Sequence, residues 1–286
     1  MIELLVVIAV IGLLASIIIM NLMGTRGKAN IARGLQFSQS VHHALGSEAV
    51  GVWSFDEGSG TTAYDASGYG NDGTLVNGPV WRCASTDPSY TPAGAGCSLQ
   101  FDSVDDHVNA RNDESLNITQ ELTISAWINY PGTVEESWGG IVARRLFNVS
   151  GYSLRLRNST RTPFLQTSWL GGNSPEYHWA NPITLNKFEH IAITFSVSSG
   201  RVITYLNGII DKNVSITGSI EGGTETFYIG RYGGSFFKGL IDEVRIYEKA
   251  LETAQIKELY YAGLDRLLVK GLIDEQEYQK RLALKD

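Results

Sequence analysis

The sequence is short of positive charge, and this shortage restricts its partners. Lys and Arg total 23 against 30 Asp and Glu, which gives a net charge of −7. Proteins that bind nucleic acid neutralise its phosphates with a basic surface. The chain has no basic stripe of this kind. The composition therefore argues against a nucleic-acid partner.

Cysteine is scarce as well. The only two, Cys83 and Cys97, flank the polar stretch "CASTDPSYTPAGAGC", whose Gly and Pro predict an irregular loop. A disulfide between them would contribute about 3 kcal/mol on the loop-entropy model. It would also imply an oxidising, extracytoplasmic compartment. The alternative is a pair of unrelated free thiols.

No basic residue precedes the long apolar run at the amino terminus. The 20 residues from Leu4 to Met23 carry no charge, and a helix of that length spans a hydrocarbon core of about 30 Å. A secretory signal peptide has a basic residue before its apolar stretch, whereas here Glu3 precedes the run and Arg26 follows it. An ordinary signal anchor gives no reason for an acid at the membrane edge, where a carboxylate needs a partner.

The segment "IELLVVIAVIGLLASIII" resembles the N-terminal helix of type IV pilins and pseudopilins. Their mature chains begin with an N-methylated Phe, a short apolar stretch and a Glu. The resemblance implies that Glu3 faces the positive amino terminus, at Met1, of a neighbouring subunit in a filament. Charges about 4 Å apart gain roughly 4 kcal/mol at an effective dielectric constant near 20, which offsets much of the desolvation.

The position of this glutamate differs from the family pattern. In pilins it stands two residues deeper in the mature chain, behind a Phe-Thr type pair. We therefore expect either that Met1 is an internal methionine of a longer precursor, or that two residues of the mature end are missing.

After Gly46 the sequence changes to short alternating runs separated by Gly, Asn, Asp and Ser, which is typical of an all-β sandwich or barrel. The run 122–128 predicts a strand with Leu122, Ile124, Ala126 and Ile128 on one face, and 190–196 repeats the pattern. Asn207 and Gly208 separate two further β-rich runs and predict a type I′ hairpin.

This region resembles the concanavalin A-like, laminin-G-like jelly rolls, a superfamily of lectins, sugar-binding modules and glycosidases. Four segments carry the resemblance, in the order found in the family: "VWSFDEGSGTTAYDASGYGNDGTL", "SLQFDSVDDHV", "FEHIAITF" with "YLNG", and "GLIDEVRIYEKALETAQIKELY". We thus expect a mainly β, antiparallel jelly-roll sandwich at 47–250, a pilin-like helix at 1–46, and C-terminal helices at 251–286.

Catalytic patterns are absent from the sequence. Glycosidases of this superfamily carry acidic residues at alternate strand positions, which places two carboxylates about 5 Å apart. The chain has no such triplet and no Ser-His-Asp arrangement. We therefore expect no enzymatic activity.

Structural Ca²⁺ fits the chain better, because this cation binds carboxylate, amide and carbonyl oxygens. The candidate ligands are Asp56, Asp65, Asn71 and Asp102, all in polar segments. A fifth is Asp242, which simple alternation places on the same face as Leu240, Val244 and Ile246. An inward carboxylate needs a partner, either a metal ion or donors such as loop N–H groups or an arginine.

Sugar sites use exposed aromatic side chains beside polar groups. The segment "SWLGGNSPEYHWANP" offers Trp169, Tyr177 and Trp179, and Trp138 in "ESWGG" is a further candidate. The alternative is that these aromatic side chains fill the ends of the sandwich or lie under loops.

The C-terminal region predicts two helices. The first, over "ALETAQIKELYYAG", is expected to end at Gly263 and to dock Leu251, Ile256, Leu259 and Tyr260 on the sandwich. In the second, Asp274 is the expected N-cap of a helix bearing Tyr278 and Leu282. Its apolar face is expected to contact the N-terminal helix, the sandwich or a neighbouring subunit. The alternative is a solvated tail.

These resemblances together imply a subunit of a type IV pilus-like extracellular filament that displays a lectin-like sandwich for surface adhesion. Its implied partners are further copies of itself, the cytoplasmic membrane before assembly, prepilin peptidase, the pilus assembly machinery and glycans. One alternative is a pseudopilin of a type II secretion system or a minor tip pilin. Another is a carbohydrate-binding surface protein that is anchored by one helix and never polymerises.

Overall fold

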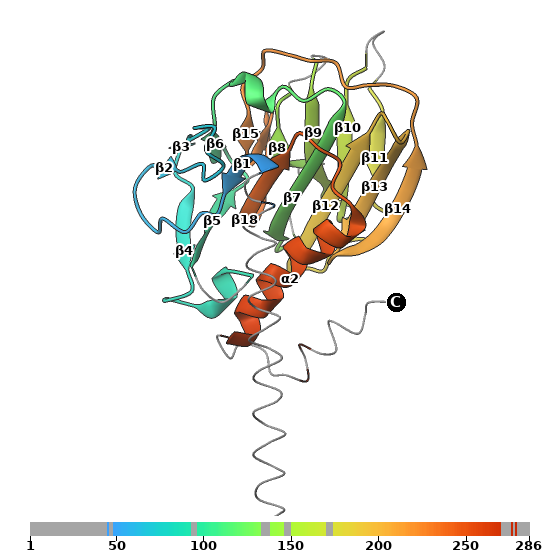
Figure 1. Cartoon of the computed structure of the whole chain (residues 1–286). Coiled ribbons are helices and arrows are strands. Elements are labelled where there is room, and N and C mark those ends of the chain that lie inside the picture. The colour runs from blue at the N-terminus through green and yellow to red at the C-terminus, as the bar shows by residue number, and fades with distance from the viewer. Residues whose placement is uncertain are drawn as a thin grey trace, which may run out of the picture. The chain divides into compact units, whose positions relative to one another are not determined.

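Two antiparallel β-sheets form the body of the protein (Figure 1). The computed structural model describes residues 45, 48–92, 96–132, 138–145, 150–169, 174–269, 276 and 278. The inner faces of the two sheets share one apolar core, which includes Ile124 of the first sheet and Leu154 of the second. The fold is thus a mainly β sandwich, as the alternating runs predicted.

The first sheet has eight strands. In spatial order they are β14 (Ile209–Ser215), β13 (Arg201–Leu206), β12 (Phe188–Ser196), β7 (Glu121–Asn129), β18 (Lys238–Tyr247), β5 (Cys97–Asp102) and β4 (Val80–Cys83), with β1 (Ala49–Trp53) also paired to β18.

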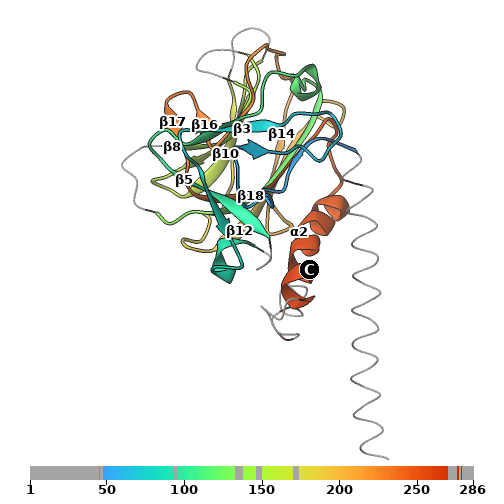
Figure 2. The same ribbon diagram turned by 90° about the vertical axis from the view of Figure 1, so that its left-hand side faces the viewer.

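The second sheet also has eight strands. Their order is β11 (Glu176–His178), β10 (Thr162–Thr167), β9 (Tyr152–Arg157), β8 (Trp138–Ala143), β15 (Tyr228–Ile229), β6 (His107–Asn109), β3 (Gly73–Val76) and β2 (Thr62–Ala63). A small hairpin of β16 (Arg231–Tyr232) and β17 (Ser235–Phe236) packs against β8 (Figure 2). The remaining elements are the 3₁₀ turns η1 (Pro88–Tyr90) and η2 (Glu114–Leu116) and the helix α2 (Thr253–Val269).

The strongest strand predictions are confirmed. Strand β7 turns Leu122, Ile124, Ala126 and Ile128 into the core, because successive side chains of a strand point to opposite faces. The predicted hairpin joins β13 to β14, and both of its turn residues have positive φ, 52° at Asn207 and 74° at Gly208. This is the backbone that a type I′ turn requires.

The predicted disulfide is also confirmed. Cys83 and Cys97 lie opposite each other at the ends of β4 and β5, and their sulfur atoms are bonded. The bridge closes a loop with a sequence separation of 14, which corresponds to a contribution of about 3 kcal/mol. It fixes the outer edge of the first sheet.

Strand β18 corrects one prediction about side-chain direction. Ile241, Val244 and Ile246 belong to the core, whereas Asp242 pairs with Trp127 on the outer face. The register shifts between Asp242 and Arg245, and Glu243 has a φ of 48°. Such a β-bulge inserts one residue and reverses the alternation beyond it. Asp242 therefore does not share a face with Val244 and Ile246.

Helix α2 covers part of the outer face of the first sheet (Figure 1). The rings of Trp127 and Tyr260 stack with centroids 5.6 Å apart, and Tyr278 packs on this pair. The predicted docking residues of the helix are all buried, namely Leu251, Ile256, Leu259 and Tyr260. The prediction that the helix ends at Gly263 was wrong, because α2 continues to Val269. A glycine inside a helix costs only about 1 kcal/mol.

The predictions for the amino terminus lie outside the described residues. They concern the helix at 1–46, with Met1 and Glu3, and the apolar run Leu4–Met23. Within the described part of the chain, no helix is both long and apolar enough to cross a membrane.

Candidate functional site

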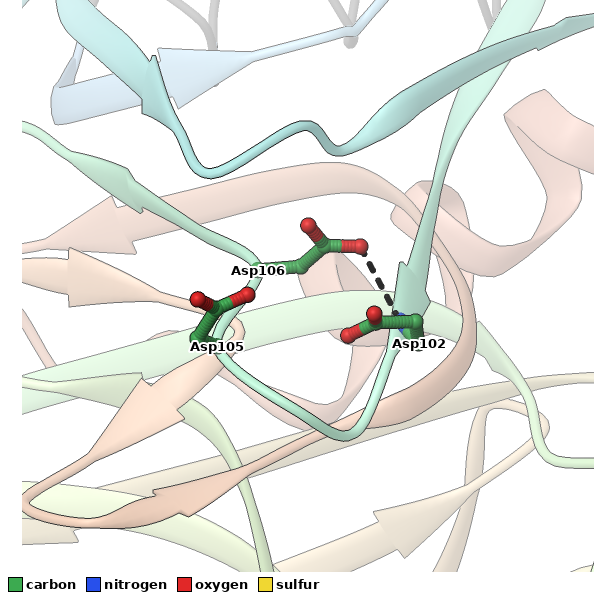
Figure 3. A group of neighbouring side chains, drawn as sticks. All are labelled: Asp102, Asp105 and Asp106. Atoms are coloured by element: carbon green, nitrogen blue, oxygen red, sulfur yellow. Dashed lines mark hydrogen bonds between the residues drawn. The ribbon is translucent and has the colours of Figure 1, made fainter.

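The turn between β5 and β6 gathers three carboxylates. Oxygens of Asp102, Asp105 and Asp106 lie within 4.8 Å of one another (Figure 3). Ser103, with a φ of 73°, lies in this turn. The backbone N–H of Asp102 donates to Asp106 Oδ2 at 3.1 Å, and the N–H of Val104 donates to Asp102 Oδ1 at 2.8 Å. Of the predicted calcium ligands, only Asp102 takes part in this group.

The three carboxylates differ in their environment. Asp106 is buried, whereas Asp102 and Asp105 are exposed. Burial, and then the charge of Asp102, raise the pKa of Asp106 to about 6, because both disfavour its ionised form. The group consists of oxygen donors alone, and these suit the hard cation Ca²⁺.

We propose that the three carboxylates of this turn bind Ca²⁺, and we expect the bound ion to stabilise the protein. A ligand that binds only the folded state, present at ten times its Kd, adds about 1.4 kcal/mol to the free energy of unfolding. Millimolar CaCl₂ should therefore raise the melting temperature of the wild type and have little effect on Asp106→Asn. The control is Glu248→Gln, an exposed position remote in sequence. Equal shifts in both variants, or no shift in the wild type, would contradict the prediction.

The other predicted calcium ligands are held by hydrogen bonds. Asp65 accepts from the N–H groups of Val52, Ser67 and Asn71 at 2.8 to 2.9 Å and from the hydroxyl of Ser67. The amide of Asn71 donates to Val50 O at 2.8 Å. These bonds satisfy the carboxylate of Asp65 without a metal ion. The side-chain oxygen of Asn71, in contrast, is buried and accepts no hydrogen bond from a described residue.

Asp56 and Asp242 also accept backbone hydrogen bonds. Asp56 accepts from the N–H of Cys97 at 3.0 Å, and Asp242 from the N–H of Glu243 at 2.8 Å. Neither aspartate joins the group at the β5–β6 turn.

Three of the four aromatic candidates pack into the sandwich. Tyr177 and Trp179 are 6% and 3% exposed and belong to the core, and the indole N–H of Trp179 donates to Tyr205 O at 3.0 Å. Trp169 is half-buried and packs against the same core. For these three residues the structure supports the alternative, namely that the aromatic side chains pack inside the sandwich.

The fourth candidate, Trp138, lies on the outer face of the second sheet among polar side chains. Strand β9 turns Leu154 and Leu156 into the core and so places Arg155 and Arg157 on the outer face. The register pairs Trp138 with Arg157. The strands β10 and β11 add Phe164 and Glu176, and His178 pairs with Phe164.

We call these residues the Trp138 cluster. Its members are Trp138, Arg155, Arg157, Phe164, Glu176 and His178.

Aromatic rings surround the buried arginine of the cluster. The Arg155 guanidinium lies 4.1 Å from the ring centroid of Tyr232, 4.5 Å from that of Phe164 and 5.4 Å from that of Trp138. Arg155 is only 4% exposed, and its burial lowers its pKa to about 10. Cation–π contacts favour the charged form, so this guanidinium is protonated at neutral pH.

The carboxylate of Glu176 contacts three basic groups of this cluster. Glu176 lies 3.7 Å from Arg155, 3.6 Å from Arg157 and 2.9 Å from the imidazole of His178. Two guanidiniums facing one carboxylate leave a positive charge on a half-exposed aromatic surface. Such a surface can stack on a sugar ring and donate hydrogen bonds to its oxygens. A glycosidase needs a second carboxylate, which the cluster does not contain.

The matching family model spans residues 102–257, which is more than half of the chain. Its description is the Concanavalin A-like lectin/glucanases superfamily. The chain belongs to this superfamily. The fold predicted from the four sequence segments is thus confirmed. Comparison with curated proteins finds no match.

Solved structures of this fold include domains of bacterial toxins. The binding domain of botulinum neurotoxin serotype G has a TM-score of 0.58 and 15% identity over 74% of this chain and 50% of its own. The ligand binding domain of serotype D, solved in complex with N-acetylneuraminic acid, has a TM-score of 0.57 and 15% identity over 76% and 51%. The present chain therefore spans about half the length of these toxin domains.

A third similar structure is matched along almost all of its length. It is domain 4 of AbnA, a GH43 extracellular arabinanase from Geobacillus stearothermophilus, in complex with arabinotriose. Its TM-score is 0.53 and its identity 20%, over 74% of this chain and 98% of that one. At these identities the likeness concerns the fold.

Proposed function

We propose that the chain is a subunit of a type IV pilus-like extracellular filament whose jelly roll binds glycans at the Trp138 cluster. Two observations support the glycan part, the superfamily and the sugars bound to two similar structures. The pilin-like segment "IELLVVIAVIGLLASIII" supports the filament part. Adhesion to glycan-coated surfaces follows as the role of such a filament.

The proposal depends most on the environment of Trp138. This side chain is half-buried, faces outward from β8 and lies beside two guanidiniums. These guanidiniums in turn face the carboxylate of Glu176, which also contacts the imidazole of His178. The cluster combines a flat apolar surface with hydrogen-bond donors and an acceptor. Sugar recognition uses both, because a pyranose ring has apolar C–H faces and a rim of hydroxyl groups.

A glycan array tests this function directly. The labelled protein should bind a defined set of glycans, and Trp138→Ala should weaken the binding by roughly 30-fold, which corresponds to about 2 kcal/mol for a central aromatic contact. The control is Tyr69→Ala. Tyr69 is 56% exposed and lies between β2 and β3, at the other end of the second sheet. Undiminished binding by Trp138→Ala would contradict the location of the site.

We further propose that the domain binds glycans without cleaving them. The support is the single carboxylate of the cluster, since glycoside hydrolysis uses a pair. The glycans captured on the array are the substrates to incubate with the protein. Release of new reducing ends, lost in Glu176→Gln, would overturn this part of the proposal.

A further inference from the structure

A polar pocket opens on the outer face of the first sheet, beside the beginning of α2, with a volume of about 280 Å³. Outward side chains of β7, β12 and β13 and residues 250–253 line it. The Trp138 cluster belongs to the other sheet, so the pocket is a separate site.

Thr194 on β12 is the most informative residue of the pocket. It is 3% exposed, lines the pocket, and its hydroxyl has no hydrogen-bond partner among the described residues. Its oxygen is not among the fully enclosed polar atoms that lack a partner, so it faces the open pocket. A bound molecule with oxygen atoms can hydrogen-bond to it there.

An acceptor and a donor lie beside this hydroxyl in the lining. Glu121 Oε1 accepts from the hydroxyls of Ser196 at 3.1 Å and Ser198 at 2.7 Å, whereas Oε2 accepts from no described residue. Arg201 uses Nη1 to donate to Asn213 Oδ1 at 3.1 Å. The remaining N–H donors of its planar guanidinium group can bond to a ligand.

The net charge of the lining decides between two classes of ligand for this polar pocket, anions and neutral molecules with hydroxyl groups. A helix N-terminus such as that of α2 attracts anions. However, the carboxylates of Glu121 and Glu252 line the pocket with the single guanidinium of Arg201, which leaves one negative charge in excess. An anion would be repelled, whereas a hydroxyl group can donate to a carboxylate and accept from a guanidinium.

We propose that this pocket binds one neutral sugar residue, whose hydroxyl groups meet Thr194, Glu121 and Arg201. Ile203 provides an apolar patch in the lining, against which the C–H groups of the ring can pack. The site would give the domain a second glycan contact on the sheet opposite to the Trp138 cluster. The two contacts bind independently, because they share no residue.

Methyl NMR of the full chain tests the inference. The apolar run Leu4–Met23 calls for lipid nanodiscs, which avoid detergents with sugar headgroups. D-glucose, D-galactose, D-mannose and L-arabinose are titrated one at a time while the methyl signals of Thr194 and Ile203 are followed. At least one sugar should shift both signals in a saturable way.

Variants connect these shifts to the pocket. Thr194→Val keeps the shape of the side chain and removes a hydroxyl that bonds to no described residue, so it should fold with a melting temperature close to that of the wild type. This variant should bind the sugar at least tenfold more weakly than the wild type, as measured from the titration of the Ile203 methyl signal. Thr74→Val, at an exposed position of the second sheet, should bind like the wild type.

Three results would overturn the inference. They are no shift with any of the four sugars, equal affinity in Thr194→Val, and inorganic phosphate shifting the two signals when the sugars do not. The variant Trp138→Ala separates the pocket inference from the proposed glycan binding at the Trp138 cluster. If this variant loses binding on the glycan array but its pocket titrates like that of the wild type, both sites are supported. If the variant loses array binding and no sugar shifts the pocket signals in the wild type, only the site at the Trp138 cluster is supported.

Discussion

Cells that produce Glu3→Ala are expected to carry no surface filaments, whereas wild-type cells carry filaments that contain the chain. The proposed cause is the loss of the ion pair between Glu3 and the amino terminus of the neighbouring subunit. At about 4 Å and an effective dielectric constant near 20, this pair is worth roughly 4 kcal/mol per subunit. In a polymer the loss recurs at every contact, so assembly should fail altogether.

Electron microscopy of sheared surface material, with an immunoblot of the membrane fraction, measures the outcome. The variant should still reach the membrane, since alanine makes the segment more apolar. Glu3→Gln should fail equally, because it keeps the shape and removes the charge. The control is Glu248→Ala, at an exposed position of the jelly roll.

The same preparations distinguish the alternatives. Filaments formed by Glu3→Ala would contradict the ion pair. A wild-type chain that is displayed at the surface and never polymerises would support the anchored carbohydrate-binding protein. A chain present only in trace amounts in the filaments would support a minor tip pilin, and a chain confined to the periplasm would support a pseudopilin.

Arg155→Ala is expected to lower the free energy of unfolding by about 3 kcal/mol, as large truncations of buried side chains do. The side chain is 4% exposed, lies between the rings of Tyr232 and Phe164, and donates a hydrogen bond to Gln166 Oε1. Truncation would leave a cavity between β9 and the β16–β17 hairpin and would remove one of the two guanidiniums that face Glu176.

Arg155→Met is the matched variant. Its apolar chain fills most of the same space, and replacing a buried charge by a well-packed apolar group is often nearly neutral. We expect it to recover most of the stability that Arg155→Ala loses, measured by chemical denaturation of both. If the two variants were equally unstable, the charge and its hydrogen bonds, rather than packing, would hold the hairpin.

Local patterns predicted the parts of the fold that local physics controls. Leu122 to Ile128 alternate because one face of β7 is buried, and Asn207 and Gly208 tolerate positive φ, so both elements were evident from the sequence. Asp242 was misplaced because a single bulged residue, Glu243, reverses the alternation. A bulge has no reliable sequence signal when its residue is not glycine.

The candidate site was only partly predictable, because it depends on which strands become neighbours. Trp138 was identified, but its partners come from β9, β10 and β11. The sequence carried a weak signal for them, since "SLRLR" alternates Leu154 and Leu156 with two arginines. Nothing local separates Trp138 from Trp179, which packs in the core and donates its indole N–H to Tyr205 O.

The position of β18 has a consequence for how the chain is made. The last strand of the sandwich lies inside its first sheet, where it pairs with β7, β5 and β1, and Ala49 of the first strand lies opposite Tyr247 of the last. Contacts between such distant parts of a chain form late. The sheet cannot close until the ribosome has delivered Tyr247. The first sheet of the nascent domain therefore stays incomplete until almost the whole domain has been synthesised.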